Sequence, residues 1–123
     1  PALTKKNIII CDRFIDSTIA YQIHGKKVEK NLINSVHKHI LNDIKPNLTF
    51  VLKLNLNKAF KRLNQRGKKN RYDKFSKKFY NKVQDAFIKI AQKNKKRYVI
   101  LDTSQDNLMV ENIIFSKVIR FVK

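Results

Sequence analysis

Three short apolar runs rich in branched side chains, each separated from the next by a helical pattern, constrain the fold of this chain most. They cover Asn7 to Cys11, Leu48 to Leu54 and Arg97 to Leu101. Continuous apolar runs of this length are typical of strands in a parallel sheet, because helices cover both faces of such a sheet. The order strand, helix, strand, helices, strand, helix therefore predicts an α/β fold with a parallel sheet.

The segments beside these runs carry apolar residues at a spacing of three to four, which predicts helices. The first helix ends at Lys45-Pro46, since proline disfavours helical backbone at the residue before it. The second begins at Asn57, a residue type that caps helices, and runs out near Gly67. The positions expected to face the core are Val28, Leu32, Ile33, Val36, Ile40, Leu41 and Ile44; Ala59, Phe60 and Leu63; Phe79, Val83, Ala86, Phe87, Ile90 and Ala91; and Leu108, Ile113, Ile114, Val118 and Phe121.

The chain is strongly basic, with 28 Lys plus Arg against 9 Asp plus Glu and a net charge of +19. Clustered basic residues bind nucleic-acid phosphates, so a small basic nucleic-acid-binding module is one alternative. However, 50 of the 123 residues are Lys, Ile or Asn, which are the residues of A/T-rich codons. The aromatic residues also belong to a helical stripe and do not form a stacking platform. We therefore attribute most of the lysine excess to codon composition and expect no specific nucleic-acid partner.

Chain length and cysteine content further narrow the class of protein to which this chain can belong. A chain of 123 residues, 42% of them hydrophobic, is the size of one domain. No apolar run is long enough to span a bilayer, so we expect no membrane partner. The single cysteine, Cys11, has no second cysteine in the chain to pair with, which fits a reducing cytoplasm.

Polar residues directly follow two of the apolar runs. Asp12 and Arg13 come after the first, and Asp102, Thr103 and Ser104 come after the third. In open parallel sheets ligands bind beyond the carboxyl ends of the strands. A carboxylate there can hold hydrated Mg2+, and a guanidinium can bind two phosphate oxygens at once. A structural Asp-Arg pair, or a helix cap at the third run, would show the same spacing.

A short helical segment after Arg13 offers hydroxyl, aromatic and amide groups. These chemical types suit a sugar and a base edge, and they equally suit an ordinary helix start. The residues are Ser17, Thr18, Tyr21 and Gln22.

A basic segment around Gly67 is a further candidate site. Arginines on a loop that closes over a substrate can neutralise charge on a transferred phosphoryl group and exclude water. A solvated loop would look similar, but this segment keeps arginine where the composition favours lysine, which suggests bidentate contacts. Its basic residues are Arg62, Arg66, Lys68, Lys69 and Arg71, and its arginines together with Arg13 are four of the six in the chain.

Taken together, these segments resemble the bacterial thymidylate kinases over essentially the whole chain. In that family a strand is followed by Asp-Arg-Tyr/His/Phe, then by Ser-Ser/Thr and Ala-Tyr-Gln. The corresponding residues here are Asp12-Arg13-Phe14, Ser17-Thr18 and Ala20-Tyr21-Gln22. Pro46 to Thr49 is similar to the family's Pro-Asp-Leu-Thr. Asn70 to Asp73 is similar to the end of its lid, although Asn70 and Asp73 depart from the usual acids.

The resemblance implies a three-layer P-loop NTPase-like nucleoside monophosphate kinase fold, with one domain over residues 1–123 and a lid at about 62–75. It implies transfer of the γ-phosphoryl group of ATP to dTMP, giving dTDP for dTTP biosynthesis, with Mg2+. By position, Arg13 would bind the dTMP phosphate and take part in catalysis, and Asp12 would support that region and Mg2+ through water. Nucleotide and thymine contacts would come from Ser17, Thr18 and Gln22, deoxyribose contact from Tyr21, lid charge and catalysis from Arg62, Arg66 and Arg71, and the adenine border from Asp102, Thr103 and Ser104.

One motif of the resembled family is missing from this sequence. The phosphate-binding loop Gly-x-x-x-x-Gly-Lys-Ser/Thr needs two glycines five apart, and the chain has only Gly25 and Gly67. In the family that loop follows a first strand, which lies between the strands that correspond to Asn7–Cys11 and Leu48–Leu54. We therefore expect a carboxy-terminal fragment that lacks the amino-terminal strands and is inactive alone.

The resemblance also implies a second copy of the chain as a partner, in a homodimer that forms through helices including the one from Val28 to Ile44. A related deoxynucleoside or nucleoside monophosphate kinase remains an alternative within the same class of enzyme.

Overall fold

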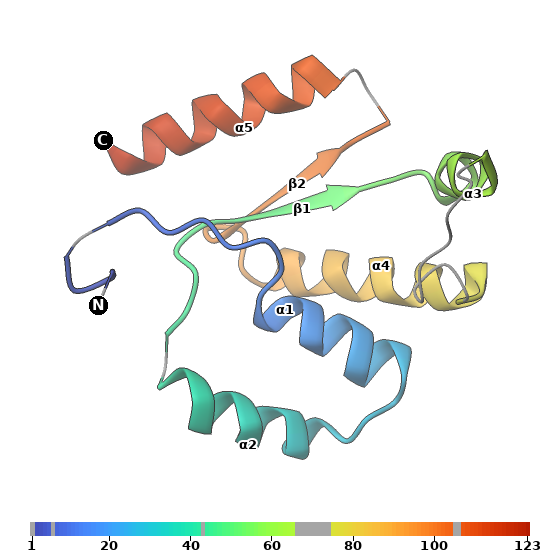
Figure 1. Ribbon diagram of the computed structural model, residues 1–123, viewed down its shortest axis with the longest axis horizontal. Helices are drawn as coiled ribbons and strands as arrows, with labels where there is room; N and C mark the ends of the chain where they lie inside the picture. The colour runs from blue at the N-terminus through green and yellow to red at the C-terminus, as the bar shows by residue number, and fades with distance from the viewer. Residues whose placement is uncertain (1, 6, 43, 66–74, 105–106) are drawn as a thin grey trace.

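Helices make up most of the described chain, and two short strands run through its centre (Figure 1). The computed structural model describes residues 2–5, 7–42, 44–65, 75–104 and 107–123. The elements, in chain order, are α1 (Ile15–Thr18), the π-helix η1 (Ile19–Gly25), α2 (Lys30–Leu41), β1 (Thr49–Lys53), α3 (Leu56–Gln65), α4 (Lys77–Lys93), β2 (Tyr98–Asp102) and α5 (Asn107–Val122).

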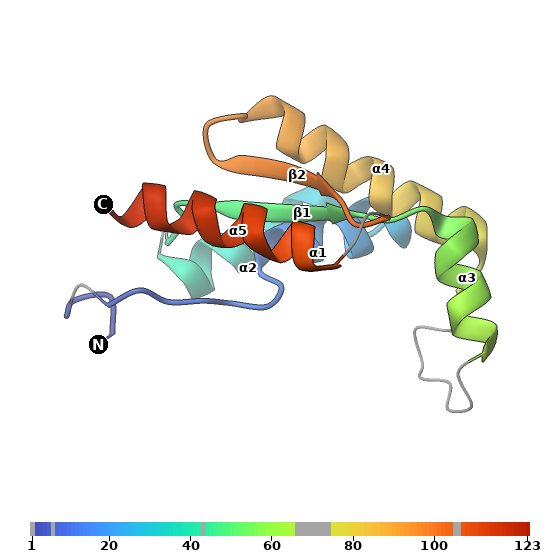
Figure 2. The ribbon, with the colours of Figure 1, turned by 90° about the horizontal axis from the view of Figure 1, so that it is seen from above.

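The two strands pair in parallel, as the sequence predicts. Their register runs from Thr49 opposite Tyr98 to Lys53 opposite Asp102. Figure 1 shows α5 on one side of the strands and α4 with α1 on the other, and Figure 2 shows the same molecule from above. The prediction of a parallel α/β arrangement with helices on both sides is therefore confirmed.

The segment from Asn7 to Cys11 is not a strand, so this prediction is wrong for the described chain. Its backbone is irregular, and Ile8, Ile9 and Ile10 are 68%, 52% and 93% exposed. A strand requires a hydrogen-bonded neighbour, and the sheet that the described residues form consists of β1 and β2 alone. An apolar run without such a neighbour cannot satisfy its backbone groups as a buried strand.

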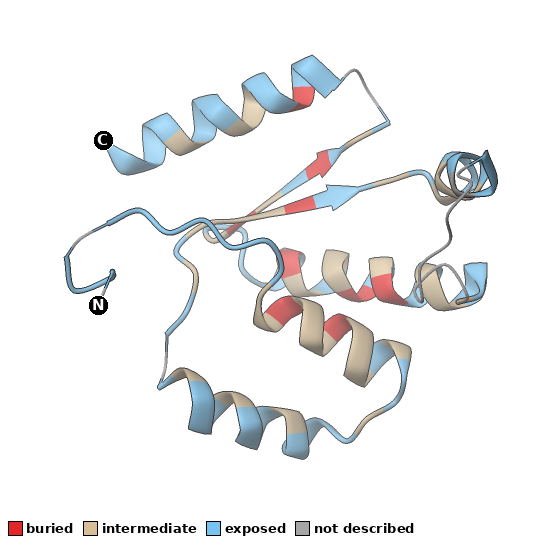
Figure 3. Ribbon diagram, viewed as in Figure 1, coloured by how far each residue is buried: buried red, intermediate tan, exposed pale blue. Residues whose placement is uncertain are grey.

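Two small apolar clusters form the core, and both rest on α4 (Figure 3). In the first, Ala20 of η1 packs with Val83 and Ala86 of α4. In the second, Val51 of β1 packs with residues of α4 and β2. The helix α4 therefore carries η1 on one side and the sheet on another, as its predicted apolar stripe requires.

The other predicted apolar stripes are buried less than expected. On α2, Leu32 and Ile40 are 55% and 68% exposed, and the helix contains no fully buried residue. On α5, Val110 is buried whereas Leu108 and Phe121 are exposed. The spacing predicts that these helices form, but α2 ends at Leu41, where Asn42 adopts a left-handed backbone, and not at Lys45-Pro46. Burial depends on a packed neighbour that spacing alone does not reveal.

Side-chain caps mark the starts of α3 and α4. The predicted cap at Asn57 is wrong, because the side chain of Asn55 accepts hydrogen bonds from the backbone N–H groups of Asn57 and Lys58, at 3.0 and 3.3 Å. Ser76 caps α4 by accepting from the Phe79 N–H at 3.2 Å. Each cap satisfies donors that have no partner within the helix.

Candidate functional site

A tight turn presents Asp12 and Arg13 just before α1. Both side chains are exposed, and Arg13 has a φ of 64°, a conformation that non-glycine residues rarely adopt. The Arg13 guanidinium carbon lies 5.4 Å from the centroid of the Tyr21 ring. The turn therefore brings the predicted phosphate ligand onto the predicted sugar contact.

Tyr21 is held in place by aromatic residues of α4. Its ring centroid lies 6.0 Å from that of Phe79 and 6.3 Å from that of Phe87, in tilted and edge-on geometries. Such geometries match the ring quadrupoles of aromatic pairs. The predicted contacts that accompany Tyr21 on the same helical segment are half-buried, and these are Ser17, Thr18 and Gln22.

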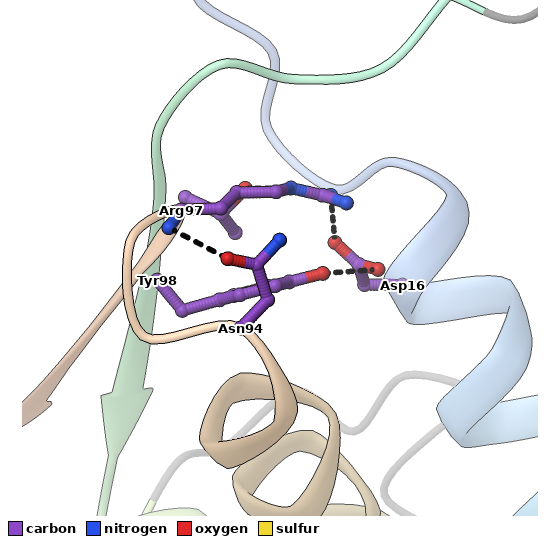
Figure 4. A network of polar contacts seen from close by, with 5 residues as sticks. Asp16, Asn94, Arg97 and Tyr98 are labelled. Atoms are coloured by element: carbon purple, nitrogen blue, oxygen red, sulfur yellow. Dashed lines mark hydrogen bonds and ion pairs between the residues drawn. The ribbon is translucent and has the colours of Figure 1, made fainter.

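A partly buried ion pair anchors the first turn of α1 (Figure 4). Asp16 accepts a hydrogen bond from the Arg97 Nη2 at 2.6 Å and another from the Tyr98 hydroxyl at 2.8 Å. The Arg97 guanidinium also lies over the Tyr98 ring, 4.5 Å from its centroid. These contacts join α1 to the amino end of β2.

The same network sets the ionisation of Tyr98. Burial raises the pKa of its hydroxyl well above the ordinary value, because a phenolate loses water there. The hydrogen bond to Asp16 and the negative charge of that carboxylate raise the pKa further, while Arg97 opposes them. Tyr98 therefore stays a neutral donor to Asp16 at physiological pH.

The carboxyl ends of the two strands form a second polar region. A pocket of about 440 Å³ opens there between the strands, the start of α3 and α4. The predicted adenine residues Asp102 and Ser104 are part of its lining, together with Lys53, Leu54, Asn55, Leu56, Asn57, Lys77, Asn81 and Gln84. The pocket is therefore a polar cavity with two lysines at the edge where parallel sheets bind ligands.

Hydrogen bonds shape this edge. Gln84 of α4 accepts from the Leu54 N–H at 3.0 Å, and Thr103 donates its N–H and its hydroxyl to the Lys53 carbonyl, at 2.8 and 3.0 Å. The Ser104 N–H donates to Asp102 at 2.8 Å. Hydrogen bonds from the Ser104 side chain and backbone lower the pKa of Asp102, desolvation opposes them, and the charges of Lys53 and Lys58 lower it further.

The structure brings some predicted site residues together and keeps others apart. Arg13 and Tyr21 form one group against the Phe79 and Phe87 rings of α4, and Asp16 of the same segment contacts Tyr98 at the amino end of β2. Asp102 and Ser104 lie at the opposite end of the same strand. Arg62 is an exposed residue near the end of α3, and the other predicted lid arginines, Arg66 and Arg71, lie outside the described residues.

Asp16, Arg97 and Tyr98 are not among the site residues that the sequence pattern predicts. Asp16 stands two residues after the Asp-Arg-Phe motif, and Arg97 is one of only six arginines in a lysine-rich chain. The retention of arginine at position 97 was therefore a usable signal. Its partner is 81 residues away, however, and no local spacing connects the two.

Two other classes of feature are not found among the described residues. Within the described ranges, no helix combines the length and apolar character that crossing a membrane requires. Over the same residues, no group of three or more His, Cys, Asp or Glu side chains could hold a metal ion.

Comparison with known proteins gives a consistent result. The sequence model of the family described as thymidylate kinase matches residues 1–114. A thymidylate kinase of Wolbachia pipientis wMel is 43% identical over 121 residues, covering 96% of this chain and 59% of the relative. One of Ehrlichia chaffeensis is 37% identical over 115 residues, covering 94% of this chain and 54% of the relative.

A solved structure is similar as well. The crystal structure of thymidylate kinase from Ehrlichia chaffeensis aligns with a TM-score of 0.65 and 31% identity. The alignment covers 98% of this chain and 54% of that one. The chain thus spans about half the length of the relatives it matches.

Proposed function

The chain belongs to the thymidylate kinase family, and on that premise we propose that the protein transfers the γ-phosphoryl group of ATP to dTMP, giving dTDP. The family match over residues 1–114 is the observation that carries this proposal. Relatives with the same printed name cover nearly the whole of this chain.

The turn before α1 is our proposed dTMP site. Arg13 would bind the dTMP phosphate, because a planar guanidinium can lie with its face on an aromatic ring while its edge donates two parallel hydrogen bonds to phosphate oxygens. Its position 5.4 Å from the Tyr21 ring centroid supports this arrangement. Tyr21 would then contact the deoxyribose, and Ser17, Thr18 and Gln22 the nucleotide and its base.

Magnesium would belong to the same site. Mg2+ in nucleotide enzymes is usually held by one or two carboxylates together with substrate phosphates and water, so the single exposed carboxylate of Asp12 is chemically suited to it. When bound, the metal supplies positive charge that neutralises the phosphates. Asp12 would orient it through a water molecule.

The ATP side of the site would use two further groups. Arg62, Arg66 and Arg71 would supply positive charge to the transferred phosphoryl group from a lid at about residues 62–75. The pocket at the carboxyl ends of β1 and β2 would border adenine through Asp102, Thr103 and Ser104. Its polar lining and its place at the ligand-binding edge of the sheet support this assignment.

The deciding experiment is a coupled assay of dTDP formation on the complete protein that contains this chain, with dTMP, ATP and Mg2+. We expect turnover, and the absence of dTDP would refute the proposal. The 123-residue chain alone is the control, and we expect it to be inactive because its sequence lacks the phosphate-binding loop. A panel of nucleosides and nucleoside monophosphates as acceptors would reveal a different substrate if dTMP were not preferred.

We also propose a homodimer that includes α2. The exposed apolar residues Leu32, Val36 and Ile40 lie on this helix, and contact with a second copy would remove them from water. Light scattering of the complete protein tests this, and a monomer at all concentrations would contradict it.

The single unpaired thiol of Cys11 supports a cytoplasmic location for the protein.

A further inference from the structure

Among the described residues, Asp16 is the one charged residue that is buried, with 6% of its surface exposed. A carboxylate loses its water on burial, which is unfavourable unless charged and hydrogen-bonding partners replace that water. Both carboxylate oxygens of Asp16 have such a partner, Arg97 for one and Tyr98 for the other (Figure 4). The group is therefore held at a fixed place by hydrogen bonds to both of its oxygens.

The partners of Asp16 are themselves tied to the framework. Arg97 donates through its Nε to the Thr49 hydroxyl at 3.4 Å and through its backbone N–H to the Asn94 side chain at 3.3 Å. Its carbonyl accepts from the Thr49 N–H at 2.9 Å. The ion pair thus attaches α1 to the starts of both strands and the end of α4.

The first turn of α1 depends on this attachment more than an ordinary helix start would. No side chain caps its amino end at Phe14, and the helix has only four residues before it continues as η1. Just before it, Arg13 adopts a φ of 64°. Backbone conformations of this kind persist only where surrounding contacts determine them.

We propose that Asp16 is a positioning residue for the dTMP site, acting through Arg97 and Tyr98. Asp16 lies three residues after Arg13, near the start of the continuous helical segment that carries Tyr21 five residues later. Fixing Asp16 therefore fixes both the turn that presents Arg13 and the rotation of the segment that carries Tyr21. The inference rests on the proposed function, because it assigns the effect of this clamp to dTMP.

The test compares three variants of the complete protein by steady-state kinetics. Asp16→Asn keeps the size of the side chain and removes its charge, and Tyr98→Phe removes one hydrogen bond and keeps the ion pair. Asp85→Asn changes an exposed aspartate of α4 and is the matched control. All three are assayed well below their melting temperatures, so that each enzyme is folded.

We expect Asp16→Asn to lower kcat/KM for dTMP by about 10- to 100-fold, since a small misplacement of a binding group costs about that much. The KM for ATP should stay within about twofold, because the proposed ATP residues lie at the other end of β2. Tyr98→Phe should show the same selective change with a smaller size, and Asp85→Asn should match the wild type.

Several results would overturn the inference. One is an unchanged kcat/KM for dTMP in Asp16→Asn. Another is an equal loss for both substrates without a change in either KM, which indicates only a smaller fraction of folded enzyme. If Asp16→Asn does not fold, Tyr98→Phe decides by the same criteria.

A separate readout distinguishes this failure from failure of the proposed function. If the wild-type protein forms no dTDP, the proposed function is wrong, and amide hydrogen exchange over residues 15–25 still measures the clamp. We expect faster exchange there in Tyr98→Phe than in Asp85→Asn. Equal exchange rates in the two variants would show that the clamp does not fix this segment.

Discussion

Gly25, at the end of η1, sits so close to α4 that a single added methyl group should destabilise the protein. A Cβ atom at this position would lie 2.7 and 2.9 Å from two ring carbons of Phe79 and 3.2 Å from the Val83 Cγ2. Ordinary contacts between carbon atoms are about 3.5–4.0 Å, so the nearest contact would be short by about 0.8 Å. The variant Gly25→Ala therefore forces Phe79 or the helix to move.

The ring of Phe79 has little room to retreat. It stacks on Phe75 with centroids 4.2 Å apart and meets Tyr80 edge-on at 5.8 Å. Overpacking of this kind costs about 1–3 kcal/mol. Because Gly25 does not have a positive φ, alanine fits the backbone and returns about 0.4–1 kcal/mol by restricting the unfolded chain. We therefore expect a net loss of about 1–2 kcal/mol.

Urea denaturation of the complete protein measures this free energy of unfolding. The exposed helical substitution Ser35→Ala is the control and should change the free energy by less than about 0.5 kcal/mol. In a Phe79→Leu background the smaller side chain relieves the contact, so Gly25→Ala should cost less than it does in the wild type. Equal or greater stability of Gly25→Ala, or the same cost in both backgrounds, would refute the packing argument.

Three further predictions concern single side chains. Arg13→Lys should lower kcat/KM for dTMP by about 10- to 100-fold, because an ammonium group cannot reproduce the bidentate contact, and wild-type kinetics would contradict the role of Arg13. Ser76→Ala should lower the free energy of unfolding by about 1 kcal/mol in urea, since the Phe79 N–H loses its cap, whereas Ser76→Thr should largely preserve it. Ser104→Ala should raise the pKa of Asp102 toward 3.8 in a carboxyl NMR titration, because the main cause of its lowering is removed. A lowered folded-state pKa stabilises the fold above the unfolded value and loses that effect as the pH falls, so the variant should be less pH-sensitive on the acid side, and an identical titration would count against the Ser104 hydrogen bond.

The sequence predicts those strands and helices whose own residues show a clear apolar pattern. The apolar runs over Leu48–Leu54 and Arg97–Leu101 coincide with β1 and β2 to within a residue or so, and the stripe on α4 predicts both its length and its buried face. Asn7–Cys11 has an equally strong pattern but is not a strand. Whether this segment forms a strand depends on a neighbouring strand with which it can pair, and that is a property of the whole sheet and not of the segment.

The contacts of the candidate site also differ in how far the local sequence predicts them. The pairing of Arg13 with Tyr21 could be expected from the motif, because the two lie on one short segment. The Asp16–Arg97 pair could not, since its partners are far apart in the sequence and only the packing of α1 against the start of β2 brings them together. Burial of a carboxylate is visible only once that packing is known.

Arg97 shows why arginine persists in a chain where lysine is so abundant. Its guanidinium donates to Asp16 through Nη2, donates to Thr49 through Nε, and lies over the Tyr98 ring. An ammonium group can donate in several directions but has no planar face to stack, so lysine would lose at least one of these contacts. The geometry at position 97 thus gives independent support to the reasoning applied to Arg13, which also lies over an aromatic ring.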